Sequence, residues 1–293
     1  MSFFMEVLIA GLLAGVMYSL VALGFVLIFK ASGVLNYAQG TMALFAALSF
    51  VSFVEMGINF WVALLLTAII MVILAFVVER VVLRPLVNQP LITLFMATIG
   101  LSFFLEGFAQ ALWGSQVHRL ELGISDDPIF IGDIMVSQFD IFAGVTAAAM
   151  VAGLAFFFSK TKMGRALRAV ADDHQAALSI GIPLRHIWVL VWVVAGFVAI
   201  VAGLLWGSRL GVQFALSLII LKAFPVLILG GFESIPGAIV GGLIIGSSEK
   251  LAEVYLGPYV GGGIENFFPY MLALAFLLIR PYGLFGEVHI ERV

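Results

Sequence analysis

Four ionisable residues stand inside long apolar runs and are the first candidates for chemistry in this sequence. Glu106 lies in an aromatic segment, and Lys222, Glu249 and Lys250 lie in later apolar segments. A charge is costly in hydrocarbon, so such side chains pair with an opposite charge or line a solute path. Glu249 and Lys250 are adjacent, so a helix would direct them to different sides. We therefore consider Glu106 and Lys222 as candidates for a translocation path, with structural ion pairing or a closing contact between subunits as the preferred interpretation.

Two amides, Asn36 and Gln39, stand at a polar break before an apolar run. An asparagine at such a position often caps a helix start. It could equally contact a solute. The sequence therefore adds Asn36 and Gln39 to the possible translocation path, with capping as the preferred reading.

The sequence contains none of the motifs HExxH, GxSxG or GxxxxGK[ST], and it has no cysteine. Thiolate metal sites, disulfides and a cysteine nucleophile are thereby excluded, and nucleotide binding is disfavoured. The glycine-rich tracts at 229–242 and 261–263 instead predict close helix packing and a sharp turn. The acidic connection at 118–139 lacks the spacing of a calcium-binding loop and predicts a solvated loop. We expect no catalytic residue, cofactor or metal, and no nucleic-acid partner, because no basic groove accompanies the aromatic residues.

The composition places this chain in a lipid bilayer. Hydrophobic residues make up 63% of the 293 residues and charged residues only 11%, against about one half and one quarter in water-soluble domains. The apolar runs are continuous rather than alternating, which favours helices over a β-barrel. The first run, 7–29, is too long for a cleaved signal peptide and follows no basic segment. The sequence thus predicts an all-α polytopic integral membrane protein.

The apolar runs predict about eight or nine transmembrane or half-membrane helices in a single transmembrane domain over 1–293. Their expected ranges are 7–29, 34–54, 61–82, 91–113, 139–158, 187–207, 214–231, 238–256 and 266–280. Nine crossings would place the two termini on opposite sides of the membrane.

The basic residues orient this arrangement. If the N-terminus is outside, the inner breaks and the tail hold Lys30, Arg80, Arg84, Lys160, Lys162, Arg165, Arg168, Arg185, Arg280 and Arg292. The outer connections then hold only Arg119 and Arg209. Because basic residues concentrate on the cytoplasmic side, we expect the N-terminus outside and the C-terminus in the cytoplasm.

One inner connection, 160–186, is long, polar and helical in pattern. Helix-favouring residues run from Ala166 to Leu178, and Gly181 and Pro183 supply stop signals. The expected apolar side is Leu167, Val170, Ala171, Ala177 and Leu178, and the expected polar side is Arg165, Arg168, Asp172 and Asp173. Such a helix could receive motion from a cytosolic motor, or it could lie on anionic lipid headgroups.

Motifs at both ends of the chain resemble a known family. The N-terminal part contains GVMYSLVALG at 15–24 and GVLNYAQG at 33–40. The C-terminal part contains KAF at 222–224, LGG at 229–231, SIPGA at 234–238, GG at 241–242 and RPYGLFG at 280–286. In this order and spacing they resemble, from end to end, the permease subunits of the branched-chain amino acid family of ABC importers. The resemblance implies the ABC importer permease fold and a place in the bacterial inner membrane.

The same resemblance implies a role for the inner connection. The segment 160–186 is similar to the cytoplasmic loop on which the ATPase docks. The ATPase-coupling residues implied are Gly164, Arg165, Arg168, Ala171, Asp172, Asp173, Gly181 and Ile182. The implied partners are two cytosolic ABC ATPase subunits, a second and different permease chain, and a periplasmic solute-binding protein. ATP hydrolysis would occur wholly in the ATPases, and this chain would form half of a path for branched-chain amino acids or for amides, urea or carboxylates.

An ion-coupled secondary transporter is the main alternative, because broken helices and buried charges also suit such carriers. A passive channel is a further alternative. The long inner connection and the resemblance over the whole chain favour the importer over both.

Overall fold

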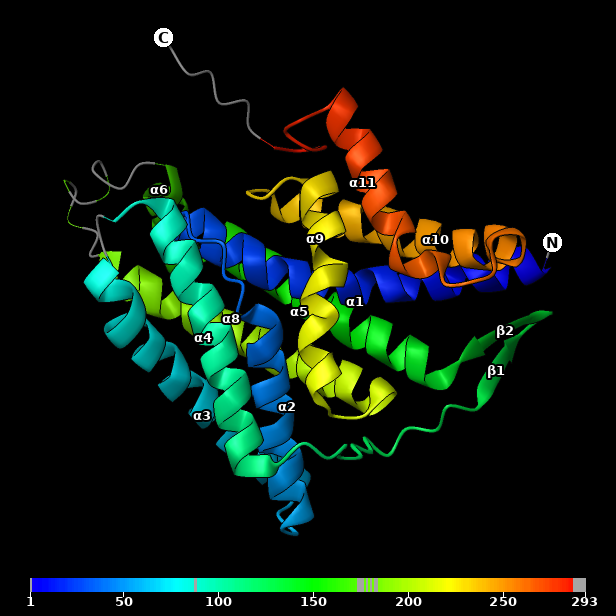
Figure 1. Cartoon of the computed structure of the whole chain (residues 1–293), viewed down its shortest axis with the longest axis horizontal. Helices are drawn as coiled ribbons and strands as arrows, with labels where there is room; N and C mark the ends of the chain where they lie inside the picture. The colour runs from blue at the N-terminus through cyan, green and yellow to red at the C-terminus, as the bar shows by residue number, and fades with distance from the viewer. Residues whose placement is uncertain are drawn as a thin grey trace. The chain divides into compact units, whose positions relative to one another are not determined.

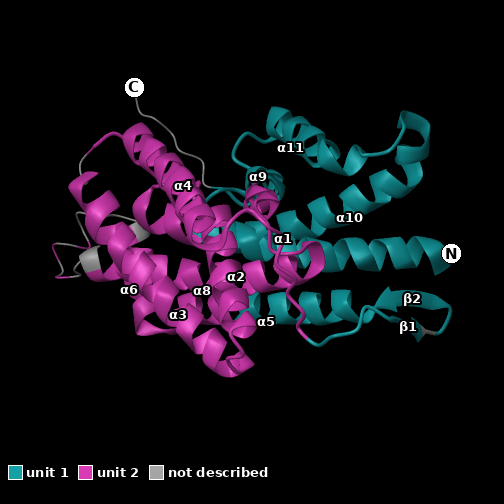
Figure 2. Ribbon diagram, turned by 60° about the horizontal axis from the view of Figure 1, so that its bottom comes forward, with its two compact units in different colours: residues 1–26, 123–152, 221–293 teal, residues 27–122, 153–220 magenta. Residues whose placement is uncertain are grey.

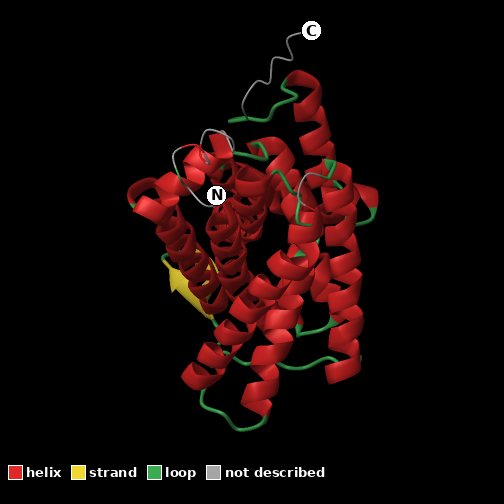
Figure 3. Ribbon diagram, turned by 90° about the vertical axis from the view of Figure 1, so that its left-hand side faces the viewer, coloured by secondary structure: helices red, strands yellow, loops and turns green. Residues whose placement is uncertain are grey.

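Helices form most of the protein in the computed structural model, which describes residues 2–86, 89–172, 177, 179, 181 and 184–286 (Figures 1 and 3). The α-helices are α1 (Ser2–Ser32), α2 (Gln39–Glu55), α3 (Phe60–Val77), α4 (Leu91–Trp113), α5 (Gln138–Lys160), α6 (Lys162–Asp172), α8 (Leu184–Leu210), α9 (Ile219–Gly230), α10 (Ile235–Val260) and α11 (Phe268–Ile279). A π-helical turn, η1 (Val78–Leu83), extends α3, and short 3-10 turns form η2 (Arg84–Leu86), η3 (Phe214–Leu218) and η4 (Ile264–Asn266).

Each of the nine expected apolar segments is helical, which confirms the all-α membrane class. Within the described residues, five helices are long and apolar enough to cross a membrane, and a sixth span arises if one bent pair counts as one. Two of the expected spans are shorter helices, since α2 has 17 residues and α11 has 12. A straight crossing needs about 20 residues, so these two fit the half-membrane class better than the full-span class.

The expected spans 214–231 and 238–256 form the bent pair. The segments Phe214–Gly230 and Ile235–Val260 meet at 115°, as a broken span or a re-entrant loop would. Gly231 has a φ of 100°, a conformation that favours glycine. Ser234 then caps α10, because its Oγ accepts a hydrogen bond from the backbone N–H of Gly237 at 3.0 Å. The predicted sharp turn in this glycine-rich tract is therefore present.

The chain forms two compact units, shown in teal and magenta in Figure 2. Unit 1 comprises Met1–Val26, Gly123–Ala152 and Leu221–Val293, and unit 2 comprises Leu27–Leu122 and Gly153–Ile220. The helices α1, α5 and α9 contribute residues to both units. Neither unit is a continuous stretch of chain.

Small residues bring helices of unit 1 into close contact. A Cβ atom added at Gly11 would lie 2.7 Å from the Cα of Ser247, and one at Gly15 would overlap the carbonyl of Gly242. Residue numbers rise along α1 as they fall along α10, so the two helices run antiparallel. Glycine removes the side chain that would keep the backbones apart, as is common between membrane helices.

Unit 2 is built around α2, whose residues from Gln39 to Val51 are all buried. It packs against α3, α4, α8 and η3. The contact with α8 is tight, because a Cβ atom added at Gly203 would overlap the carbonyl oxygen of Ala43. Being apolar on every side, α2 has the pattern of a helix enclosed by other helices.

The acidic connection between α4 and α5 contains a β-hairpin that the sequence analysis did not predict. Strand β1 (Pro128–Ile131) pairs antiparallel with β2 (Ile134–Ser137). Gly132 has a φ of 66° in the two-residue turn, which suits a tight hairpin. The backbone N–H of Met135 donates to Oε1 of Glu6 at 2.9 Å, so the hairpin lies beside the start of α1 in unit 1.

Candidate functional site

Glu106 lines a cavity of about 360 Å³ within unit 2. The walls come from the segment before α2, from α2 itself, from α4 and from the η3–α9 junction: Tyr37, Thr41, Ser102, Phe103, Glu106, Phe214, Ala215, Ser217, Leu218 and Ile220. The volume lies at the lower end of the range for small-molecule sites. Such a cavity can hold a small solute.

The cavity wall on α4 follows from the helical period. Thr98, Ser102 and Glu106 are spaced four residues apart, so they share one face of α4. Thr98 is fully buried, accepts a hydrogen bond from the backbone N–H of Tyr37 at 3.1 Å and donates to the carbonyl of Leu35 at 3.0 Å. These bonds fix α4 against the entry to α2 and so place Glu106 at the cavity.

Most hydroxyl groups of the wall already have partners. The hydroxyls of Thr41 and Ser102 share a hydrogen bond of 2.5 Å, and Ser217 donates to the carbonyl of Phe214 at 2.7 Å. Glu106 is half-buried and is the one charged side chain among the wall residues that the structure describes. In the described parts of the chain it makes no hydrogen bond or ion pair. The electrostatic character of the cavity is therefore set by a carboxylate.

A glycine lets two walls approach each other. A Cβ atom added at Gly40 would overlap the carbonyl oxygen of Ser217 and would lie 3.1 Å from the Cβ of Ile220. The first turn of α2 therefore contacts the backbone of η3 directly. A larger residue at position 40 would separate the two elements that frame the cavity.

Asn36 and Gln39 are not on the cavity wall. Both are fully buried, at 0% and 1% exposure. The Asn36 amide donates to Oε1 of Gln39 at 3.3 Å, its Oδ1 accepts from the backbone N–H of Ala38 at 3.1 Å, and Gln39 donates to the carbonyl of Ala195 at 3.2 Å. Ala38, not Asn36, occupies the N-cap position of α2. Asn36 is therefore not the N-cap of α2. The bonds of Asn36 and Gln39 instead hold the start of α2 against α8.

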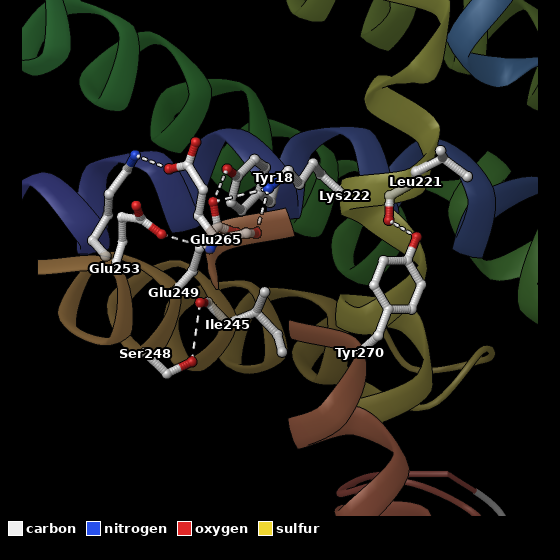
Figure 4. Close-up of polar contacts among 10 residues, drawn as sticks. Tyr18, Leu221, Lys222, Ile245, Ser248, Glu249, Glu253, Glu265 and Tyr270 are labelled. Carbon is white, nitrogen blue, oxygen red and sulfur yellow. Dashed lines mark hydrogen bonds and ion pairs between the residues drawn. The ribbon is translucent and has the colours of Figure 1, made fainter. Parts of the chain in front are cut away.

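Lys222, the fourth candidate, lies in unit 1 and forms an ion pair (Figure 4). Its Nζ is 3.1 Å from Oε1 of Glu249 and donates to the carbonyl of Glu265 at 2.7 Å. Tyr18 donates to the same Glu249 oxygen at 3.0 Å. The Glu249 side chain is 1% exposed and that of Lys222 is 25% exposed. This arrangement is the structural ion pairing that the sequence analysis preferred for Lys222.

Neighbouring charges extend this network toward the end of α10. Lys250 pairs with Oε2 of Glu265 at 2.9 Å, and Glu253 accepts from the backbone N–H groups of Gly263 and Glu265 at 3.0 and 2.9 Å. Glu249 and Lys250 thus have different partners, as expected for adjacent helical residues. The network ties α1, α9, α10 and η4 together within unit 1.

The amphipathic helix expected in the segment 160–186 is present as α6, which begins four residues before the expected start at Ala166. Its apolar side is buried, with Leu167 at 2% and Val170 at 0% exposure, while Arg165 and Arg168 are exposed. This confirms its amphipathic character. Ala171 and Asp172 end the helix, Gly181 forms a turn with a φ of 84°, and Asp173 and Ile182 lie outside the described residues.

The start of α6 is fixed against the end of α5 within unit 2. Thr161 accepts a hydrogen bond from the backbone N–H of Gly164 at 3.0 Å. A Cβ atom added at Gly164 would lie 2.6 Å from the Cα of Phe158. Arg168 donates to the carbonyl of Ser159 at 3.2 Å, and α6 also packs on α8. Movement of α6 would therefore pass directly to α5 and α8.

Sequence reasoning missed several polar residues that the fold brings into use. Thr98 and Ser102 could have been found, because together with Glu106 they form a polar stripe at intervals of four residues. Tyr18 could not, since its partner Glu249 is 231 residues away. Glu79 was also missed. It lies in the π-helical turn η1 and is 2% exposed, and its Oε2 has no hydrogen-bond partner among the residues that the structure describes.

Apolar spans, a bent helix pair, a cavity with one carboxylate and an amphipathic surface helix together define a multi-pass membrane protein of the transport class. In the described residues, no group of three or more His, Asp or Glu side chains could hold a metal ion.

The comparison with known families makes the assignment specific. Residues 7–279 match the family described as branched-chain amino acid transport system / permease component, and the chain belongs to this family. This membership confirms the resemblance drawn from the sequence motifs.

Individual relatives match over nearly their whole length. The high-affinity branched-chain amino acid transport system permease protein LivH of Salmonella typhimurium is 31% identical over 99% of this chain and 98% of its own length. LivH of Escherichia coli K12 is 30% identical, and BraD of Pseudomonas aeruginosa is 28% identical, with the same coverage. The chain is thus similar to these transport permeases.

Proposed function

We propose that this chain is one transmembrane subunit of an ATP-driven ABC importer. It would form half of the translocation path for branched-chain amino acids or related small polar solutes such as amides, urea or carboxylates. The observation that carries the proposal is α6, an amphipathic helix with buried apolar and exposed basic residues, in a chain of this permease family. The names of the relatives support branched-chain amino acids as the first solutes to test.

The partners follow from the division of labour in such an importer. Two cytosolic ATPases would bind and hydrolyse ATP, and they would dock on the segment 160–186 of the permease. A second, different permease chain would supply the other half of the path, and a periplasmic binding protein would deliver the solute. The complex would lie in the bacterial inner membrane.

Contacts around α6 suggest how ATP would drive transport. A single residue, Thr161, separates α5 from α6, and α6 also packs on α8. A displacement of α6 by the ATPases would therefore move the inner ends of two long helices. For ATP to favour one arrangement, it must bind that arrangement of the complex more tightly than the other.

Contacts inside unit 1 support the proposed orientation. Glu6 at the start of α1 binds the β-hairpin of the acidic connection, so these two lie on the same side. Because α1 and α10 run antiparallel, Val260 at the end of α10 lies on that side as well. The excess of basic residues in the other connections assigns the opposite side to the cytoplasm. The backbone N–H of Leu284 donates to the carbonyl of Leu229 at 2.8 Å, so the C-terminal part of the described chain lies at the other end of α10. We therefore propose that the N-terminus is outside and the C-terminus inside.

Reconstitution tests this function. The permease would be co-purified with its partner permease and ATPases, placed in proteoliposomes, and supplied with its binding protein and radiolabelled leucine. We expect uptake to need ATP and to persist when the proton gradient is collapsed. An ATPase variant that cannot hydrolyse ATP is the matched control and should abolish uptake. Leucine uptake that instead follows an ion gradient without the ATPases would favour a secondary transporter, and uptake without any energy source would favour a channel.

A further inference from the structure

Among the described residues, the wall of the cavity in unit 2 has one carboxylate and no cationic side chain. We propose that Glu106 binds the ammonium group of an aliphatic amino acid in this cavity. The inference rests on the proposed transport function and deepens it, because it selects zwitterionic amino acids over carboxylates and over uncharged amides or urea.

Charge complementarity is the first step. A half-buried carboxylate at membrane depth, with no partner in the described residues, is costly unless a cation neutralises it. An ammonium group offers three N–H donors and a full positive charge. A solute with only a carboxylate would be repelled by Glu106, and a neutral amide would form a weaker hydrogen bond. The cavity therefore favours a solute that carries an ammonium group.

The remaining wall suits an aliphatic side chain. Apolar atoms come from Phe103 on α4 and from Phe214, Leu218 and Ile220 around η3. Burial of a branched aliphatic group against such residues is favourable in proportion to its area. The apolar wall and the carboxylate together match the two chemically different parts of a branched-chain amino acid.

The start of α2 provides a place for the solute carboxylate. Tyr37 and Thr41, which flank the first turn of α2, also line the cavity. The N-terminal end of a helix carries partial positive charge, and the first turn of α2 contains no acidic residue that would neutralise it. A zwitterion with its ammonium group at Glu106 would thus have a favourable site for its carboxylate in the same cavity.

Site-specific labelling measures binding directly. The chain has no cysteine, so Leu218→Cys introduces a single thiol on the cavity wall, at a position where Leu218 is 56% exposed. The assembled complex would be treated with a maleimide alone, with leucine, or with 4-methylpentanoate, which is leucine without its ammonium group. We expect leucine to slow labelling and 4-methylpentanoate to have no effect. Equal protection by both compounds, or protection by neither, would overturn the proposal.

Substitution of the carboxylate completes the test. In the Leu218→Cys background, Glu106→Gln keeps the shape of the side chain and removes its charge. It should raise the leucine concentration needed for protection by about tenfold or more, because one charge-assisted hydrogen bond is lost. Glu106→Asp should retain part of the protection. Glu121→Gln is the matched control, because Glu121 is exposed in the same unit and does not line the cavity. The leucine concentration that protects the Glu121→Gln variant from labelling should equal the concentration that protects the Leu218→Cys parent.

The two proposals fail in different ways. Suppose that the parent complex shows ATP-driven leucine uptake, and that the Glu106→Gln complex, assembled to the same level, takes up leucine at the same rate. If leucine also protects the thiol of this variant from labelling as well as in the parent, the ammonium site is wrong and the importer assignment stands. If the parent complex needs no ATP but leucine protection depends on Glu106, the importer assignment is wrong and the ammonium site stands.

Discussion

At the residue scale, two carboxylates at membrane depth have opposite surroundings. Glu249 is buried and receives hydrogen bonds from Lys222 and Tyr18. Glu106 borders a cavity and has no partner among the described side chains. A satisfied ion pair stabilises an arrangement of helices, whereas an unsatisfied carboxylate beside a cavity is available to a ligand. The same side-chain type therefore serves structure at one position and is available for binding at the other.

The ion pair of unit 1 predicts a defined pattern of stability. Lys222→Met would leave the Glu249 carboxylate buried without its cation, which costs about 3–5 kcal/mol when one partner of a buried pair is removed. The double variant Lys222→Met, Glu249→Gln should recover part of this loss, because the uncompensated charge is gone. Thermal unfolding in detergent, followed by the loss of monodisperse complex, measures both variants.

Lys250→Met is the control for this series. Its partner Glu265 is 37% exposed and Lys250 itself is 31% exposed, so loss of this pair should cost no more than about 1 kcal/mol. If Lys222→Met were as stable as the parent, the pair would not stabilise the fold and Lys222 would again be a candidate for the solute path.

At the element scale, the apolar runs were sufficient to place the helices, because continuous hydrophobicity over about 20 residues has few alternatives in lipid. They did not show that 214–231 and 238–256 bend at 115° into one pair. A hydropathy profile averages over a window of residues, so it cannot resolve a break of four residues between two helices. The glycines and Pro236 nevertheless marked the position of this break. The β-hairpin was missed because Pro128 to Ser137 is short and its acidic surroundings resemble a solvated loop.

The candidate site was less predictable than the helices. Glu106 could be singled out because it is a charge in an aromatic segment. The remaining wall comes from segments near residues 37–41 and 214–220, which are distant in sequence. Their approach depends on Gly40, whose lack of a side chain allows contact with Ser217. Contacts of this kind arise from tertiary packing and leave no local pattern in the sequence.

The junction of α5 and α6 allows a test of coupling. Gly164→Ala would place a Cβ atom within 2.6 Å of Phe158 backbone atoms. The start of α6 would therefore have to move away from α5. We expect the membrane helices to remain folded while ATP-driven uptake falls several-fold and copurified ATPase is reduced. Gly153→Ala is the matched control, because Gly153 lies on α5 with open space around it, and alanine favours a helix by about 1 kcal/mol over glycine. Normal uptake by Gly164→Ala would show that the position of α6 does not govern coupling.

At the scale of the whole molecule, the distribution of charge and the contacts of unit 1 both support the proposed orientation. Basic residues concentrate in the connections that include α6, and the acidic hairpin lies beside the start of α1. The positive-inside rule and the contacts of unit 1 are independent of each other. Termini on opposite sides of the membrane require an odd number of complete crossings between them.

Single thiols can test this orientation, since the parent chain has none. Gly132→Cys lies in the hairpin turn and Arg165→Cys on the exposed side of α6. In intact cells, a membrane-impermeant maleimide should label Gly132→Cys and should reach Arg165→Cys only after the membrane is opened. Arg119→Cys, exposed in the predicted outer connection, is a second external control and should behave like Gly132→Cys. Labelling of Arg165→Cys in intact cells would place α6 outside, where no cytosolic ATPase could reach it, and both the orientation and the ATP-driven mechanism would then fail together.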